Sequence, residues 1–248
     1  MNPALVLVAH GSRDPRFGAT ARRVRDAVAA TLPGVEVVLS YLDLDEPLVG
    51  DVLGRTGNEA GGDGTGGDPV VVPLLLSAGY HHKIDLPAII AEHRPFAHQT
   101  DVIGTRSFTA ALADRLLEAG LDERDGVILS AVGSSDESAD RHVRRRALEL
   151  STHLHRPVEV VFATKLGSGD RAVASAVRRL RAAGAERVAL SPYFLSAGLL
   201  IERVETALDA LVEEMLVAGP LGAHPDVIGG ICSLYRAAAR DRAVTASR

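Results

Sequence analysis

The sequence predicts an α/β fold made of two similar doubly wound, Rossmann-like domains with parallel sheets, related by internal duplication. Short apolar runs alternate with amphipathic helical segments along the chain, and the same order of elements occurs twice. Two motifs also recur: the Gly-Ser pairs at Gly11 and Gly133 are 122 positions apart, and the Ser-Ala-Gly triplets at Ser77 and Ser196 are 119 apart. Each half of the 248 residues is long enough to bury a core. We therefore expect domains at residues 1–122 and 123–248.

The strands and the first helix of the first half are predicted from the spacing of apolar residues. Continuous apolar runs, without alternation, are typical of strands covered on both faces of a parallel sheet. Such runs occur at Ala4–Ala9, Val35–Tyr41 and Val70–Leu75. A helix is indicated between Pro15 and Pro33-Gly34 by a single apolar stripe. This stripe consists of Phe17, Ala21, Val24 and Val28.

The second half repeats this order of strand and helix. Strands are expected at Val127–Ala131, Val158–Phe162 and Arg187–Ser191. Helices are expected near Ser138–Ser151, Asp170–Ala183 and Ile201–Val217. The last of these carries a stripe typical of a helix packed on a sheet. The stripe is formed by Ile201, Val204, Leu208, Leu211 and Met215.

Composition excludes several classes of protein. A net charge of -5 gives no general attraction to nucleic acid or to an anionic membrane, so neither is expected as a partner. The single cysteine, Cys232, excludes disulfide frameworks and thiolate metal sites. Without a signal-peptide pattern or a membrane-length apolar segment, a cytoplasmic location is expected. The glycine-rich stretch Gly54–Asp68 lacks the Gly-Lys-Ser/Thr ending of a phosphate-binding loop, so we expect a loop without chemistry.

The duplication singles out His10 and His81 as candidates for chemistry. In the second copy of each motif the surrounding residues persist, but Val132 stands where the first half has His10, and Leu200 stands where it has His81. A histidine that only filled space would not be lost selectively from two matched positions. The alternative for His10 is a structural histidine bonded to a neighbouring carbonyl.

Both histidines are predicted to lie at the same edge of the first sheet. His10 directly follows the first strand, and His81 lies just beyond the third. In a common strand order of doubly wound sheets, these two strands flank the switch point where ligands bind. Neutral imidazole binds Fe, Co, Ni and Zn and accepts protons near neutral pH. Glu46, which follows the second strand, supplies a candidate carboxylate, with a solvated helix-start glutamate as the alternative.

Several cations are expected near the mouth of this site, where they would suit an anionic substrate. They are Arg13, Arg16, Lys83 and Arg106. His82 is expected to point in a different direction from its neighbour His81 and to be secondary. The sequence alone does not decide whether His82, Arg106 or His224 takes part in the site.

Taken together, these residues resemble the sirohydrochlorin chelatases, the ATP-independent (class II) enzymes of tetrapyrrole metal insertion, in the CbiX-type form with two fused halves. The resemblance depends on the order and spacing of several motifs and covers nearly the whole chain. These motifs are His10–Pro15, Glu46-Pro47, Pro73–His81 with its continuation Lys83–Pro87, and the degenerate second copy.

The resemblance implies insertion of Co²⁺ or Fe²⁺ into sirohydrochlorin with release of two protons, in cobalamin or sirohaem biosynthesis. It implies no cofactor beyond the substrate metal ion. Residues 1–122 would be the catalytic half and residues 123–248 a degenerate chelatase-like half. Because the duplication mimics a symmetric dimer, a monomer and a homodimer are both compatible with it. The sequence does not decide which metal ion is the substrate, since such sites select their metal largely by geometry and availability.

The resemblance also assigns roles to residues. It implies that His10 is the proton acceptor and a metal contact, that His81 is the second metal-contacting histidine, and that Glu46 assists. The residues implied to contact the macrocycle are Glu46, Leu76, Ser77, Ala78, Gly79, Tyr80 and His81, with Arg13 and Lys83 as cations for the substrate. The chain departs from the family pattern at two places. Tyr80-His81-His82 replaces a Gly-His-Val type sequence, and Arg106 stands where a His-Pro pair is common.

Three other classes of function are compatible with parts of the sequence. A histidine phosphatase also has a His-Gly after its first strand, but it needs an arginine before the histidine, where this chain has Ala9. A dinucleotide-binding oxidoreductase is disfavoured because no Gly-x-Gly-x-x-Gly follows the first strand. A two-lobed protein that binds a metal or a small molecule without catalysis is the main alternative.

Overall fold

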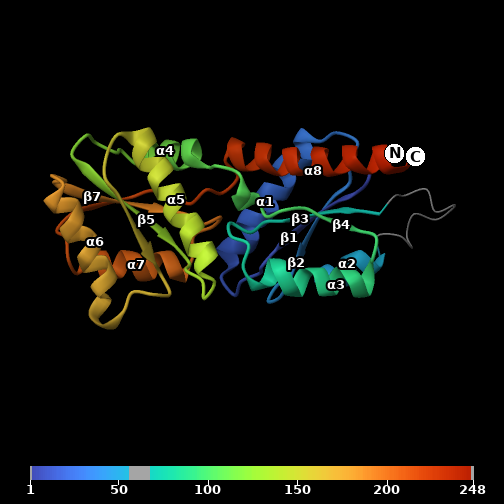
Figure 1. Ribbon diagram of the computed structural model, residues 1–248, viewed down its shortest axis with the longest axis horizontal. Helices are drawn as coiled ribbons and strands as arrows, with labels where there is room; N and C mark the ends of the chain where they lie inside the picture. The colour runs from blue at the N-terminus through green and yellow to red at the C-terminus, as the bar shows by residue number, and fades with distance from the viewer. Residues whose placement is uncertain (1, 56–67, 247–248) are drawn as a thin grey trace. The chain divides into compact units, whose positions relative to one another are not determined.

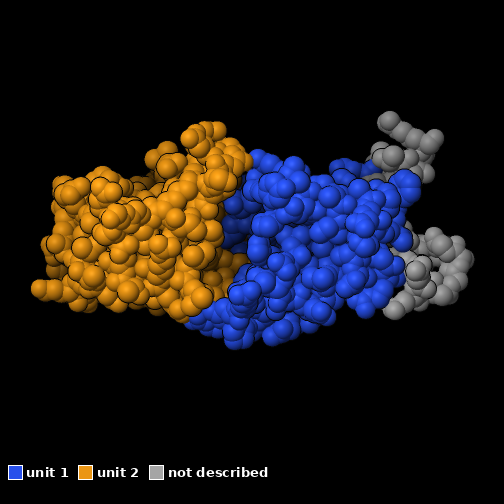
Figure 2. Space-filling model, turned by 90° about the horizontal axis from the view of Figure 1, so that it is seen from below, with its two compact units in different colours: residues 1–106, 225–248 blue, residues 107–224 orange. Residues whose placement is uncertain are grey.

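The computed structural model describes residues 2–55 and 68–246. The chain divides into two compact units (Figure 2). Unit 1 comprises Met1–Arg106 together with Pro225–Arg248, and unit 2 comprises Ser107–His224. Most of the glycine-rich stretch expected to be a loop at Gly54–Asp68 lies outside the described residues. None of the described helices combines the length and apolarity needed to cross a membrane.

Unit 1 is built on a four-stranded parallel sheet in the order β2-β1-β3-β4. The strands are β1 (Leu5–Ala9), β2 (Val37–Tyr41), β3 (Val70–Pro73) and β4 (His98–Gln99). Every residue of β1 is fully buried, because the strand is central and both faces of the sheet are covered. The strand order reverses between β1 and β3, which places the switch point there, as predicted.

Helices cover both faces of this sheet (Figure 1). On one face α1 (Pro15–Thr31) packs against α8 (Pro225–Ala246), which also contacts β3. On the other face α2 (Val49–Arg55) packs against α3 (Leu86–His93), and their apolar side chains join Val6 and Val8 of β1 in one core. Two short helical segments complete the unit: the π-helix η1 (His81–Asp85) and the 3₁₀ turn η2 (Ile103–Thr105).

Unit 2 repeats the architecture, with a parallel sheet in the order β6-β5-β7-β8. Its strands are β5 (Asp125–Ala131), β6 (Val158–Phe162), β7 (Arg187–Pro192) and β8 (Met215–Val217). On one face lie α6 (Arg171–Ala182), preceded by the turn η3 (Ser168–Asp170), and α7 (Leu199–Asp209). The remaining helices, α4 (Thr109–Glu118) and α5 (Glu137–Leu154), pack against each other (Figure 1).

The compact units differ from the expected division at residue 122. Helix α4 belongs to the first half of the sequence but packs within unit 2, and α8 belongs to the second half but packs within unit 1. Each helix buries its apolar stripe on the sheet encoded by the other half. In α8 the buried side chains are Val227, Ile228, Ile231, Cys232, Tyr235 and Ala238. An apolar stripe shows that a helix has a buried face, but it does not show which sheet receives that face.

The duplication extends to individual backbone hydrogen bonds. Three bonds that shape the carboxyl edge of the first sheet have counterparts in the second. The bond from Leu42 N to Ala9 O corresponds to the bond from Ala163 N to Ala131 O. The bond from Asp43 N to His10 O corresponds to the bond from Thr164 N to Val132 O. The bond from Leu74 N to Val8 O corresponds to the bond from Tyr193 N to Ser130 O. These pairs align His10 with Val132, as the sequence motifs predict.

One predicted helix is wrong at its end. A helix over Ile201–Val217 was expected, but α7 ends at Asp209, and Met215–Val217 form β8, which pairs with β7. Leu211 and Met215 follow the helical spacing. The segment forms a strand instead, because its backbone can pair with the otherwise open edge of β7 through a series of hydrogen bonds. The other predicted elements agree with the structure to within a few residues at each end.

Removing residues 225–248 is expected to unfold unit 1 in preference to unit 2. Burying a large apolar side chain stabilises a fold by about 1.5–3 kcal/mol, so losing α8 removes an amount of the order of a whole domain's stability, about 5–15 kcal/mol. Hydrogen exchange would then show loss of protection at the amides of β1 and β3, with β5 and β7 still protected. Protection of β1 equal to that in the full chain would contradict the assignment of α8 to unit 1.

Unit 2 contains a buried ion pair that should make it sensitive to acid. The carboxylate of Asp125 is fully buried and accepts two hydrogen bonds from Arg187, at 2.6 Å and 2.8 Å. These bonds lower the pKa of Asp125 from its usual 3.8. The pair therefore stabilises the fold above about pH 4, and this contribution is lost as the pH falls through the lowered pKa.

The variant Asp125→Asn should lower the free energy of unfolding at pH 7 by about 3 kcal/mol, because it leaves Arg187 without its buried partner. It should also flatten the dependence of stability on pH between 5 and 2, measured by urea denaturation. An equally steep dependence in the variant would show that other carboxylates cause the acid sensitivity.

Candidate active site

The side chains of His10 and His81 meet at the carboxyl edge of the sheet of unit 1. Their Nε2 atoms are 3.1 Å apart, and the ring centroids are 4.6 Å apart. The rings are nearly perpendicular, at 86°. Both side chains are partly accessible to solvent. Two residues separated by 71 positions therefore form one contact, at the switch point between β1 and β3.

A sharp turn places His10 at the end of β1. The backbone carbonyl of His10 still accepts a hydrogen bond from Asp43 N, and the chain then reverses at Gly11, whose φ is +94°. A Cβ atom at Gly11 would lie only 1.7 Å from the carbonyl oxygen of Asp43, so only glycine fits. Beyond the turn, Ser12 N donates to Asp45 Oδ2 at 2.9 Å, which ties the loop to the segment after β2.

The start of α1 is fixed by its own side chains. Ser12 Oγ accepts a hydrogen bond from Asp14 N, and Asp14 caps the helix by accepting from Arg16 N at 3.0 Å. The guanidinium of Arg16 also bonds the Asp14 carboxylate and, with the backbone bond, holds the pKa of that group below its usual value. Arg16 is thus engaged with Asp14, whereas Arg13 is exposed.

The segment from Leu74 to Tyr80 carries the chain from β3 to His81. It is anchored to the sheet where Leu74 N donates to Val8 O at 2.8 Å, and to η2 where Gly104 N donates to Leu75 O at 3.1 Å. His81 is the first residue of the π-helix, and its carbonyl accepts a hydrogen bond from Leu86 N, five residues later. The Nδ1 atom of His81 lies 2.7 Å from Oδ2 of Asp85.

The hydrogen bonds of the two rings determine which nitrogens are free. His10 Nδ1 lies 3.1 Å from the carbonyl oxygen of Gly11, and His81 Nδ1 faces a carboxylate. Both partners only accept, so both Nδ1 atoms donate, and in neutral imidazole each Nε2 then carries a lone pair. Two lone pairs that face each other at 3.1 Å require a shared electrophile, either a proton or a metal ion.

The spacing of the two Nε2 atoms suits a metal. With metal–nitrogen bonds of about 2.0–2.1 Å, a separation of 3.1 Å corresponds to an angle of roughly 95–100° at the metal. That angle lies between the octahedral and tetrahedral values. Among the residues that the structure describes, no cluster of three or more His, Cys, Asp or Glu side chains is arranged to hold a metal ion. Two protein ligands leave the remaining coordination positions open.

Glu46, the carboxylate expected to complete the site, is exposed in the loop after β2. In the described residues it does not join His10 and His81 in a metal-holding group. The carboxylates that do contact this region are Asp45, bonded to Ser12, and Asp85, bonded to His81. The sequence prediction assigned no role to either. A signal for Asp85 was present, because His81 and Asp85 are four positions apart in a helical segment.

The other predicted site residues are distributed around His81. Leu76, Ser77, Ala78 and Gly79 are partly buried, while Tyr80 and Lys83 are exposed. His82 points away from the histidine pair, as expected, and contacts Gln99, and burial lowers the pKa of His82. Arg106 bonds Ser233 of α8. His224 belongs to unit 2, where it contacts Asp114 at 3.2 Å.

The second copy keeps the turn but not the histidines. Gly133 has a φ of +89°, Ser134 Oγ accepts from Asp136 N, and Asp136 caps α5 by accepting from Ser138 N, as in the first copy. In place of the His10 side chain stands Val132, which is 45% exposed. The turn is therefore a requirement of the fold, whereas the histidines are not.

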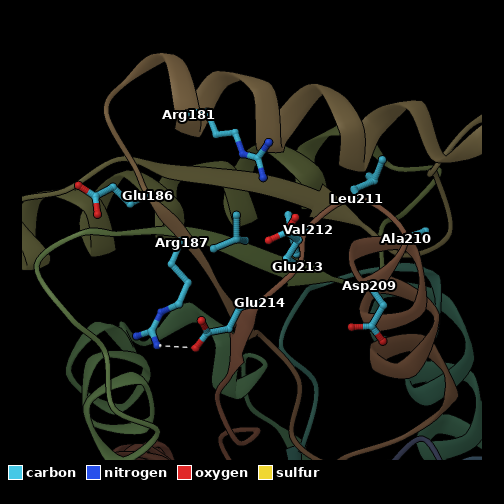
Figure 3. Close-up of a pocket in the computed structure, with 10 residues that line it drawn as sticks. Arg181, Glu186, Arg187, Asp209, Ala210, Leu211, Val212, Glu213 and Glu214 are labelled. Carbon is cyan, nitrogen blue, oxygen red and sulfur yellow. Dashed lines mark ion pairs between the residues drawn. The ribbon is translucent and has the colours of Figure 1, made fainter.

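A pocket of about 820 Å³ lies elsewhere, in unit 2 (Figure 3). It is found at the amino ends of β7 and β8, whereas ligands of doubly wound sheets bind at the carboxyl ends. Within its lining, Arg187 pairs with Glu214. Arg187 and Glu186 also pair with Asp125 and Arg124, which lie outside the lining. Its lining contains neither histidine nor cysteine, and among the described residues its carboxylates do not form a group that could hold a metal ion.

Comparison with known proteins identifies the family. The CbiX family model matches residues 4–119 and, a second time, residues 126–238. This chain belongs to the CbiX family. The double match agrees with the duplication in the sequence, and together with the two-lobed α/β fold it confirms the resemblance drawn from the motifs around His10 and His81.

Relatives of this CbiX protein are similar over most of their length. The sirohydrochlorin cobaltochelatase of Priestia megaterium is 29% identical over 248 residues, which cover 90% of this chain and 75% of the relative. The sirohydrochlorin ferrochelatase of Bacillus subtilis (strain 168) is 27% identical over 240 residues, covering 92% and 88%. The solved structure of SirB from Bacillus subtilis with Fe³⁺ is 25% identical, covers 96% of each chain and gives a TM-score of 0.77.

The variant Gly11→Ala should be strongly destabilising, because it combines an unfavourable φ with a clash against Asp43. Strain of this kind costs about 1–3 kcal/mol before the clash is counted. Gly34→Ala is the matched control: its φ is +78°, but nothing lies within 4 Å of the added Cβ. Urea denaturation should show a larger loss for Gly11→Ala. Equal losses would mean that the close approach of Asp43 has no cost.

Proposed function

We propose that this chain inserts a divalent metal, Co²⁺ or Fe²⁺, into sirohydrochlorin without ATP. The observation that carries the proposal is the His10–His81 contact, with both Nδ1 atoms engaged and both Nε2 atoms turned toward each other. The substrate is taken from the relatives, one named a cobaltochelatase and the other a ferrochelatase of sirohydrochlorin. Both metals are therefore retained as substrates, and no further cofactor is required.

The reaction needs two things from the protein. The metal ion must shed bound water before it enters the ring, and two pyrrole N–H protons must leave as it does. The two Nε2 atoms hold the incoming ion through nitrogen ligands while leaving most of its coordination positions open. A closed tetrahedral site would retain the ion instead.

The same nitrogen atoms then accept the protons. As the ring nitrogens of the macrocycle replace the imidazoles on the metal, each Nε2 regains a lone pair. His10 acts as the proton acceptor for the first pyrrole N–H, and His81 is placed to accept the second. The balance is two protons released for one divalent ion inserted. Histidine is the side chain that most often acts as a general base in such transfers.

The remaining residues are assigned to the macrocycle. Leu76, Ser77, Ala78, Gly79 and Tyr80 form the segment that leads into His81, and their partial exposure supports a role as a surface for the ring. Arg13 and Lys83 would contact the acidic substituents of the substrate. Glu46, at the same edge of the sheet, assists from the exposed loop after β2.

The variant His10→Ala is expected to lower the rate of metal insertion by about 10²–10⁴-fold, the range of a general base. His81→Ala should also lower the rate, because one metal-binding nitrogen is lost. Absorbance spectra of sirohydrochlorin with Co²⁺ or Fe²⁺ would measure both. The control is His153→Ala, an exposed histidine in the last turn of α5. Stoichiometric metal binding by the wild type without any change in the tetrapyrrole spectrum would favour a binding protein.

A further inference from the structure

We infer that Asp85 is a positioning residue of this site, which fixes the ring of His81 so that its Nε2 atom faces His10. The inference rests on the proposed function, because it concerns the same pair of imidazoles. Asp85 Oδ2 lies 2.7 Å from His81 Nδ1, a short and charge-assisted contact. The side chains of His81 and Asp85 are 48% and 36% exposed, so the contact does not serve to neutralise a buried charge.

The backbone at this point departs from a regular helix. Residues His81–Asp85 form a π-helix between the loop after β3 and α3, and such single turns often occur at functional sites. Pro87 contributes to the departure, because it has no N–H to bond the carbonyl of Lys83, four residues earlier. The irregular turn contains both the imidazole and the carboxylate.

The second copy supports a link between the two residues. The offset of 119 positions pairs His81 with Leu200. The π-turn holds one more residue than an α-helical turn, so the buried Leu86 matches the buried Val204 of α7, and Arg203 stands opposite Asp85. Helix α7 is assigned as an α-helix over its whole length, Leu199–Asp209. The histidine, its carboxylate partner and the π-turn are thus all missing together from the half that has lost His10. A carboxylate that only stabilised the helix would have no reason to follow the histidines.

The carboxylate acts through the tautomer and the orientation of the ring. With Nδ1–H donating to Asp85, the lone pair of His81 is on Nε2, the atom that lies 3.1 Å from His10. Without Asp85, the ring can rotate, and the proton can move to Nε2, where it would block the metal. Carboxylates that bond metal-binding histidines in this way also raise the basicity of the ligand, and their removal typically costs 10–100-fold in metal affinity or activity.

The test measures Co²⁺ binding in the absence of tetrapyrrole, followed by metal insertion. Asp85→Ala is expected to weaken Co²⁺ binding by about 10–100-fold and to lower kcat by a similar factor, with the KM for sirohydrochlorin unchanged. Asp85→Asn should lose less, because its amide oxygen accepts the same hydrogen bond. The matched control is Asp114→Asn, which alters a histidine–aspartate contact away from the site, that of His224 in unit 2. It should leave both quantities unchanged.

A second readout does not depend on activity. Long-range ¹H–¹⁵N spectra of histidine-labelled protein report which ring nitrogen carries the proton, and His81→Gln assigns the signal. The wild type and Asp85→Asn should show His81 protonated at Nδ1, whereas Asp85→Ala should show the Nε2–H form.

Three results would overturn the inference: an unchanged tautomer in Asp85→Ala, Co²⁺ affinity within twofold of the wild type, or an effect confined to the KM for sirohydrochlorin. Failure of the proposed function looks different. The wild type would then insert no metal, while Asp85→Ala would still weaken Co²⁺ binding and change the tautomer of His81.

Discussion

The chemistry of this protein depends on one constraint: the two Nδ1 atoms of the histidine pair are both occupied by acceptors. Gly11 O accepts a hydrogen bond from His10 Nδ1, and the Asp85 carboxylate accepts one from His81 Nδ1. The opposing Nε2 atoms are then left with lone pairs at 3.1 Å, an arrangement that is unfavourable until a cation enters it. The parallel sheet makes the meeting possible, because β1 and β3 are adjacent and end at the same level. The fold therefore holds the two Nε2 atoms where they can share a proton or a metal ion.

The duplication separates what the fold needs from what the chemistry needs. In both copies a glycine with positive φ lies two residues beyond the central strand, and a serine and an aspartate after it lead into the next helix. In the second copy a Lys165–Asp140 ion pair at 2.6 Å ties the turn together, whereas the first copy uses Asp45. The turn is therefore preserved by different side chains in the two halves. Selection on folding alone accounts for that, but not for the histidines of one half.

The sequence predicted the sheets from local apolar runs, and the histidine pair from the difference between the two copies. The apolar run Val158–Phe162 is a strand over the same residues in the structure. Other features depend on contacts that a local pattern does not contain. The apolar stripe of α8 does not show that the helix packs on β3. The helical spacing of Met215 from the preceding apolar residues does not show that its segment pairs with β7. Glu46 was predicted as the carboxylate of the site because it follows β2. The direction of a side chain in a loop, however, is set by tertiary contacts that the sequence pattern does not contain.

In the proposed site two imidazole nitrogens would hold the ion, with no third ligand among the described residues, and such a site is suited to passing a metal on. Resident zinc sites use three or four protein ligands, which hold the ion. In the proposed reaction the macrocycle offers more nitrogen atoms than the protein does, so transfer proceeds toward the ring. The protons released from the ring bind to the same Nε2 atoms that held the ion, and a protonated imidazole cannot bind metal. Deprotonation of the substrate and release of the metal therefore reinforce each other, because both use the same pair of lone pairs.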